Sequence, residues 1–317
     1  MRRFSHPVIL AAIVYFLLTV ALTWPLSIHP GSLVPNDLGD PLLNTWILAW
    51  NARVAPLTTA WWNGPQFYPI AGTMAFSEHL LGLSILATPI ILLTGDPLVA
   101  YNVVFVLTFV LSALAAYLLA FTISRRHDCA FLAGLAFGFA PYRMAQFAHV
   151  QVLSTYWMPV ALAALHRYVE DRRTRWAALF AGAWLLQALA CGYYLFYLSV
   201  LVGLWLPFFL KGPGQWRALA KLAVAWGLAT IPLVPVLYGY WHFQHAYGLR
   251  RGLDEIVTFS ADVGSLLKAP SNLLVWGWLD VVNHPEADIF PGLTIAVLVI
   301  TGLVLGWRNA AKEQVGV

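Results

Sequence analysis

Two aspartates in one short loop are the residues whose types and spacing most favour chemistry. Asp37 and Asp40 lie in the segment at residues 35–41 (PNDLGDP), directly after the first long apolar run. A carboxylate within hydrogen-bond reach of a hydroxyl group can remove its proton, so this loop predicts general-base catalysis. Structural roles stay open beside it: Asp40 could cap a helix that begins at Pro41, and Asp37 could close a turn.

Five further polar residues could assist that chemistry. Glu78 and His79 precede an apolar run, and Arg143, His149 and Gln151 follow a proline that interrupts another. Cationic side chains can take up the charge of a leaving phosphate. Four of them also have a structural interpretation. Glu78 could mark the start of a helix, His79 and His149 could be interfacial or hydrogen-bonded histidines, and Arg143 could extend to lipid headgroups. The sequence has no glycine-rich phosphate loop, zinc-binding spacing or serine nucleophile elbow.

The composition places these residues in a membrane protein. Hydrophobic residues make up 60% of the 317 residues, charged residues only 10%, and the mean hydropathy is +0.72. Soluble domains carry charge on about a quarter of their residues. Because a transmembrane helix needs about 20 apolar residues, roughly seven to nine helices fit. We predict an all-α polytopic membrane protein in which residues 1–317 form a single transmembrane domain.

The basic residues predict the topology. Most lysines and arginines fall in five clusters, at residues 2–3, 125–126, 167–175, 211–221 and 308–312. Such clusters flank membrane spans on the cytoplasmic side. We therefore expect a multi-pass protein of the plasma (inner) membrane with both termini in the cytoplasm. About eight spans follow, at residues 7–28, 97–123, 129–140, 151–168, 176–192, 193–210, 218–240 and 291–307. Since topology explains the basic excess, no nucleic-acid partner is expected.

Two predicted extracytoplasmic segments, residues 29–96 and 241–290, lie between the spans. Within the first, residues 40–54 place apolar side chains on one helical face, as in a helix that lies along the membrane interface. Residues 80–93 are ambiguous, because about 14 residues give a helix of about 21 Å, shorter than the ~30 Å hydrocarbon core. We expect a juxtamembrane or re-entrant helix there, and whether it crosses the membrane stays open.

Four short segments occur in an order that is also found in a known family of membrane proteins. They are residues 36–41 (NDLGDP), 76–81 (FSEHLL), 139–143 (FAPYR) with 149–151 (HVQ), and the segment from Glu286 to Gly292. This order resembles the GT-C superfamily of integral membrane glycosyltransferases, in particular the lipid A aminoarabinose transferase and the bacterial protein mannosyltransferases. The chain departs from many relatives in offering no acid between residues 142 and 150, and in ending after its eighth predicted span.

The resemblance implies a membrane glycosyltransferase that uses a polyprenyl-phosphate-linked sugar. Asp40 would be the base toward the acceptor, with Asp37 as second choice. The positions implied to contact the substrate are Glu78, His79, Arg143, His149 and Gln151, with Arg143 and His149 holding the lipid-linked phosphate. Some relatives use a divalent metal ion such as Mg²⁺ or Mn²⁺, but the residues themselves do not require one. Membrane lipids are the other expected partners.

Two other functions stay open. A transporter or flippase of lipid-linked substrates would place ionisable residues on broken helices within its spans. A truncated, non-catalytic relative of the transferases is the second alternative. The identity of the sugar and of the acceptor, and the oligomeric state, leave no sign in the sequence.

Overall fold

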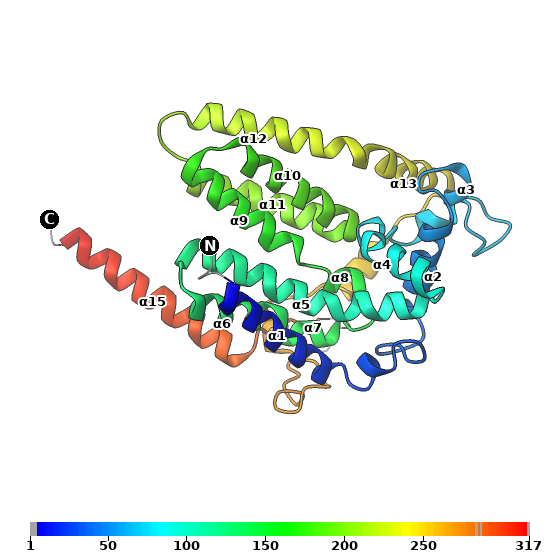
Figure 1. The fold of residues 1–317 in the computed structure, drawn as a ribbon, viewed down its shortest axis with the longest axis horizontal. Coiled ribbons are helices and arrows are strands. Elements are labelled where there is room, and N and C mark those ends of the chain that lie inside the picture. The colour runs from blue at the N-terminus through cyan, green and yellow to red at the C-terminus, as the bar shows by residue number, and fades with distance from the viewer. Residues whose placement is uncertain (1–4, 283–284, 286, 316–317) are drawn as a thin grey trace. The chain divides into compact units, whose positions relative to one another are not determined.

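A computed structural model describes residues 5–282, 285 and 287–315, with side chains from residue 6 to residue 308 within those ranges. Every regular element in this described part is a helix (Figure 1), and extended backbone pairs only at an isolated bridge between Lys268 and Asp280. The all-α prediction is therefore confirmed.

The chain forms two compact units. The first unit comprises Met1–Gly138 and Gln146–Arg250, and the second comprises Phe139–Ala145 and Arg251–Val317. The elements of the first unit are α1 (Ser5–Leu22), η1 (Leu26–Ile28), α2 (Asp40–Arg53), α3 (Thr59–Trp62), η2 (Thr73–Phe76), α4 (Leu81–Thr94), α5 (Pro97–Ser124), α6 (His127–Gly138), α8 (Val150–Leu153), α9 (Trp157–Asp171), α10 (Thr174–Ala190), α11 (Gly192–Phe209), α12 (Gln215–Thr230), η3 (Ile231–Leu233) and α13 (Val234–Tyr247).

Three helices in the described chain are long and apolar enough to cross a membrane. They are α5, α11 and the continuous helix of α12, η3 and α13, which runs from Gln215 to Tyr247. Shorter apolar helices occupy His6–Leu22, Leu81–Thr94 and Leu293–Arg308. These lengths and compositions are those of a helical membrane protein. The total of eight spans, their orientation and the particular membrane stay predictions.

Most predicted helices appear within a few residues of their expected bounds, but the span predicted at residues 151–168 divides into α8 and α9. The Gln187 side chain donates to the Ser154 carbonyl oxygen at 2.7 Å, and the Ser154 hydroxyl bonds back to the Val150 carbonyl. A carbonyl oxygen that accepts from a neighbouring helix is directed away from the helical ladder. The predicted descending span therefore begins with a short separate turn.

Helix α5 forms the centre of the first unit and contacts α1, α2, α4, α6 and α9. Its close approach to α6 depends on Gly134, where an added Cβ would lie 2.2 Å from the Tyr15 hydroxyl oxygen and 2.7 Å from the Ala113 carbonyl oxygen. Tyr15 in turn donates to the Phe131 carbonyl oxygen at 2.8 Å, which joins α1 to α6. Small residues at such contacts let membrane helices pack backbone against backbone.

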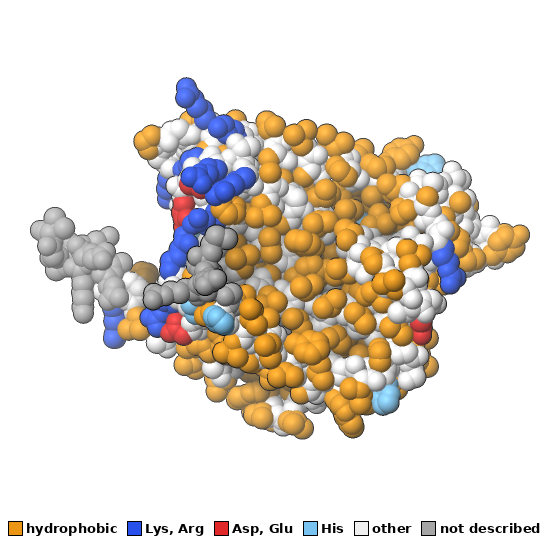
Figure 2. All heavy atoms as spheres, in the orientation of Figure 1, with side chains coloured by type: hydrophobic (Ala, Val, Ile, Leu, Met, Phe, Trp, Pro, Cys, Tyr) orange, Lys and Arg blue, Asp and Glu red, His pale blue; other side chains and the backbone are white. Residues whose placement is uncertain are grey.

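The basic side chains of the first unit gather at one of its ends. Figure 2 shows Lys and Arg side chains together where α5 and α9 end and α12 begins. Arg125 bonds Glu170 at 3.1 Å, and Arg172 donates to the Lys211 carbonyl oxygen at 3.2 Å. Three of the predicted basic clusters are thus joined by direct contacts. Asn102, in the second turn of α5, donates to the carbonyls of residues 30 and 33. The loop before α2 therefore lies near the other end of α5, about 33 Å from Ser124 along the helix.

The second unit contains the rest of the described helices, α7 (Pro141–Ala145), α14 (Leu253–Thr258), η4 (Val263–Leu267) and α15 (Leu293–Val315). Its irregular segments are held by backbone bonds from Ala269 to Leu279 at 2.8 Å and from Phe290 to Lys268 at 3.0 Å. The Asn272 side chain donates to the Met144 carbonyl oxygen at 3.3 Å. Most of the predicted outer segment at residues 241–290 therefore belongs to a folded unit.

Candidate functional site

A carboxylate–imidazole pair lies at the start of α2. The Asp40 Oδ2 atom is 2.9 Å from His149 Nε2, and the two side chains are 46% and 23% exposed. Asp40 is the first residue of α2, whose N-cap is Gly39, and no side chain caps this end. The predicted capping role of Asp40 is therefore wrong, and its carboxylate is available to the imidazole and to solvent.

Oxygen atoms face both nitrogens of the His149 ring. Besides Asp40 at Nε2, the Gln146 Oε1 atom lies 2.9 Å from Nδ1. An imidazolium satisfies both contacts with two N–H donors, and a neutral ring does so if the Gln146 amide is turned over. In either state Nε2–H donates to one Asp40 oxygen. The other oxygen can then accept a proton from a bound group.

Two buried residues support this pair from α2 and α5. Asn44 donates from Nδ2 to Gln151 Oε1 at 3.2 Å, which ties α2 to the segment that carries His149. The Tyr101 hydroxyl is fully buried and has no hydrogen-bond partner among the described residues. It lies within electrostatic range of the Asp40 and Asp37 carboxylates. A buried polar group without a partner suggests that a water or ligand binds there.

Asp37 is occupied by its own turn. Its Oδ1 accepts from the Gly39 backbone N–H at 2.7 Å, and its Oδ2 accepts from the Asn36 side chain at 2.6 Å. The turn that sequence reasoning weighed for Asp37 is thus present. Of the two aspartates, Asp40 is the one that contacts a second predicted site residue.

The other end of α2 carries a buried network around Asn51. Its Nδ2 donates to the His79 carbonyl oxygen and to Ser84 Oγ, both at 2.8 Å, and its Oδ1 accepts from Trp61 Nε1 at 2.7 Å. Asp40 and Asn51 are eleven residues apart on the helix, a rise of about 16 Å. Glu78 and His79 therefore gather at the opposite end of α2 from the Asp40–His149 pair.

Glu78 joins the loop before α4 to the corner between α10 and α11. Its Oε2 accepts from the Gly192 backbone N–H at 3.0 Å, and Cys191 Sγ lies 3.6 Å from its Oε1. Burial raises the pKa of Glu78 above its ordinary value, while its bonds to Gly192 and Cys191 lower it by a smaller amount. A carboxylate at the first N–H group of a helix is well placed to stabilise that end. The geometry thus gives Glu78 a packing role at α11 and not at the start of α4.

His79 is buried and neutral. Its Nδ1 accepts from the Leu81 backbone N–H at 3.1 Å, so the proton of the ring is on Nε2. Burial lowers the pKa of His79 to about 4. Tyr240 donates to the neighbouring Ser77 carbonyl oxygen at 2.7 Å, which joins α13 to this loop. Contact of His79 or Glu78 with a substrate stays a prediction.

The predicted phosphate holder Arg143 belongs to the second unit, in α7, where it is buried. Its role in binding phosphate stays a prediction. Glu286, which opens the last segment of the resemblance, lies outside the described residues.

An apolar groove begins beside the Asp37 loop. It encloses about 310 Å³ and is lined by Leu22, Thr23, Trp24, Pro25, Leu26, Leu33, Val34, Pro35, Phe105 and Phe147. Pro35 lies two residues before Asp37, and Phe147 two residues before His149. The groove is therefore close in sequence to the Asp37 turn and to His149.

The described residues contain no group of three or more His, Cys, Asp or Glu side chains that could hold a metal ion. The donor set at Asp40, one carboxylate and one imidazole, is short of a complete site for Mg²⁺ or Mn²⁺.

Sequence reasoning missed Asn44, Asn51 and Tyr101. Each is a polar residue within an apolar, predicted helical segment, and that pattern could have indicated a buried polar contact. Comparison with known proteins finds no family model, curated protein or solved structure that matches this chain.

Proposed function

We propose that this protein is an inverting membrane glycosyltransferase, which moves a sugar from a polyprenyl-phosphate carrier to a hydroxyl group of an acceptor. The observation that carries the proposal is the Asp40–His149 pair at 2.9 Å. It is partly exposed, and it lies at the end of α5 away from the basic clusters. A pair as exposed as this contributes little to stability, so its geometry suits chemistry better than packing.

In the proposed step, the acceptor oxygen forms a bond to the anomeric carbon of the sugar. The bond from that carbon to the phosphate oxygen breaks, and polyprenyl phosphate leaves with the bonding electrons. Asp40 takes the hydroxyl proton through the oxygen that His149 does not occupy. His149 fixes the direction of the carboxylate through the contact between its Nε2 atom and Asp40 Oδ2.

The apolar groove supports a lipid carrier. Nine of its ten lining side chains are apolar, which suits an isoprenoid chain in polarity. Pro35 lies five residues before Asp40, and Phe147 lies two residues before His149, so a carrier in the groove would lie near the pair.

The test is release of polyprenyl phosphate by the purified protein in proteoliposomes. Polyprenyl phosphates that carry single hexoses or pentoses are offered with a mixture of membrane-extracted acceptors. Asp40→Asn should slow release about 10²- to 10⁴-fold, the usual contribution of a general base. Asp37→Asn is the matched control, because an asparagine oxygen can still accept from Gly39 and preserve the turn.

Native rates in Asp40→Asn would remove the proposed chemistry from this loop. Movement of the intact lipid-linked sugar across the bilayer, without cleavage, would instead favour the transporter alternative.

A further inference from the structure

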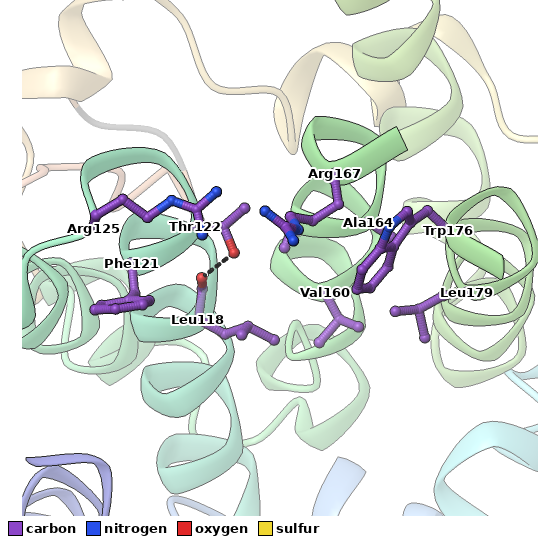
Figure 3. Close-up of a pocket in the computed structure, with 10 residues that line it drawn as sticks. Leu118, Phe121, Thr122, Arg125, Val160, Ala164, Arg167, Trp176 and Leu179 are labelled. Carbon is purple, nitrogen blue, oxygen red and sulfur yellow. Dashed lines mark hydrogen bonds between the residues drawn. The ribbon is translucent and has the colours of Figure 1, made fainter. Parts of the chain in front are cut away.

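The basic end of the first unit contains a second pocket, far from the Asp40–His149 pair. It lies between the last turns of α5 and helices α9 and α10 and encloses about 200 Å³. Figure 3 shows Arg125 from α5 and Arg167 from α9 extending toward each other above it, with Leu118, Val160 and Leu179 below. The pocket therefore combines an apolar floor with a cationic mouth.

We propose that this pocket binds an acidic phospholipid of the surrounding bilayer. One acyl chain would lie against the apolar floor, and the phosphate would accept from the guanidinium N–H groups that Glu170 does not occupy. Basic pockets between membrane helices bind acidic lipid headgroups in this way. The site takes no part in the proposed sugar transfer and does not depend on it.

Glu170 bridges the two arginines and competes with a phosphate for their donors. Its carboxylate accepts from Arg125 Nη2 at 3.1 and 3.2 Å and from Arg167 Nη1 at 2.5 Å. Each guanidinium has five N–H donors, so these bonds leave most donors of both arginines to a phosphate. One carboxylate between two guanidiniums also leaves the mouth with a net positive charge.

Trp176 gives the mouth a rigid side. The Arg167 guanidinium lies 5.4 Å from the centroid of its ring, and Arg175 stacks on the same ring at 4.7 Å. The indole N–H donates to Asp171 at 3.0 Å, which fixes the ring. Cation–π contact holds an arginine in place without consuming its in-plane donors. Arg167 is therefore oriented before a ligand arrives.

Charge and exposure favour a lipid over other occupants. Residues 125–128 and 167–175 contain six arginines, at positions 125, 126, 167, 172, 173 and 175, against three acids, Asp128, Glu170 and Asp171. Leu118 and Leu179 on the floor are 47% and 42% exposed although they are large and apolar. At the end of a membrane-crossing helix, such side chains face acyl chains, and the arginines reach the depth of the phosphates.

Native mass spectrometry of the full chain tests the proposal with defined lipids. The protein should bind dioleoylphosphatidylglycerol about tenfold more tightly than dioleoylphosphatidylcholine. The double variant Arg125→Gln/Arg167→Gln should lose that preference. The double variant Arg217→Gln/Lys221→Gln removes the same charge from α12 and should keep it. Equal losses in the two double variants would overturn the pocket in favour of general surface charge.

Two single variants test the pocket with both arginines in place. Glu170→Gln removes the competing carboxylate and should raise binding of the acidic lipid several-fold. Val160→Phe fills the floor and should lower it several-fold, with both arginines in place. Soluble glycerol phosphate should not displace the lipid, because the acyl chain supplies much of the binding. Weaker binding in Glu170→Gln, native binding in Val160→Phe, or displacement by glycerol phosphate would each contradict the proposal.

Discussion

The two ends of α2 carry the same chemical groups in opposite settings. Asp40 and His149 form a partly exposed pair at its first turn. Near its last turn, Glu78 accepts from the first N–H group of α11 and His79 accepts from the first N–H group of α4. The pKa of Glu78 is raised and that of His79 is lowered, both mainly by burial. Each shift favours the uncharged form. Burial thus separates a pair suited to proton transfer from one that serves packing.

The largest expected effect is at the exposed end. His149→Gln should lower the rate of sugar transfer about 10²-fold or more, because Asp40 loses the group that orients it. Thermal unfolding of the purified protein should shift little, since exposed pairs contribute less than about 1 kcal/mol. Transfer at the native rate in His149→Gln would contradict a catalytic role for His149 and remove the contrast between the two ends of α2.

At the buried end, His79 should make the free energy of unfolding depend on pH. Its folded pKa is about 4, below its ordinary value of 6.5. Above pH 6.5 the ring is neutral in both states and contributes nothing. As the pH falls toward 4, the unfolded chain binds a proton that the folded chain excludes, so stability decreases by up to about 3 kcal/mol.

His79→Asn is the control for that titration, because an asparagine oxygen can still accept from Leu81 and does not titrate. Unfolding in mixed micelles from pH 8 to pH 4 measures the difference between the two proteins. Parallel curves would show that His79 is accessible to protons in the folded state.

The Asn51 network should matter for stability and little for chemistry. Asn51→Leu removes three hydrogen bonds and leaves Trp61, Ser84 and the His79 carbonyl without their partner. The expected loss is about 2 kcal/mol in the free energy of unfolding. Transfer per folded molecule should stay within about threefold of native, since α2 spans about 16 Å between Asn51 and Asp40. A loss of transfer in Asn51→Leu that exceeds its loss of stability would show that the Asn51 network contributes to catalysis.

The smallest effect is expected for Glu78→Gln. The amide oxygen can still accept from Gly192, and the variant avoids burying a charge. Stability at pH 7 should therefore change by less than about 1 kcal/mol. Because the pKa of Glu78 is raised, the native protein loses stability as the pH rises through that pKa, and the variant should lack this loss. A large loss of transfer would return Glu78 to the predicted substrate contacts.

The sequence predicted the elements better than the contacts between them. Apolar runs located α2, α4, α5, α10 and α11, because hydrophobic periodicity and length are local properties. The division of the span at residues 151–168 was not predictable, since it depends on Gln187, which donates to Ser154 from another helix.

The candidate site was predicted in part for the same reason. Residue type and position pointed to Asp40 and His149, which are 109 positions apart, but nothing local indicated that they meet. The partners of Glu78 and Asn51 could not be predicted either, because a polar side chain looks the same in sequence whether it faces water or a neighbouring helix.

The most direct test of the central proposal is a double-mutant cycle on Asp40 and His149, read as release of polyprenyl phosphate. We predict that Asp40→Asn/His149→Gln is no slower than Asp40→Asn alone, because His149 acts only through the carboxylate it orients. Multiplied losses in the double variant would contradict a joint role, and a native rate in Asp40→Asn would contradict the proposed chemistry itself.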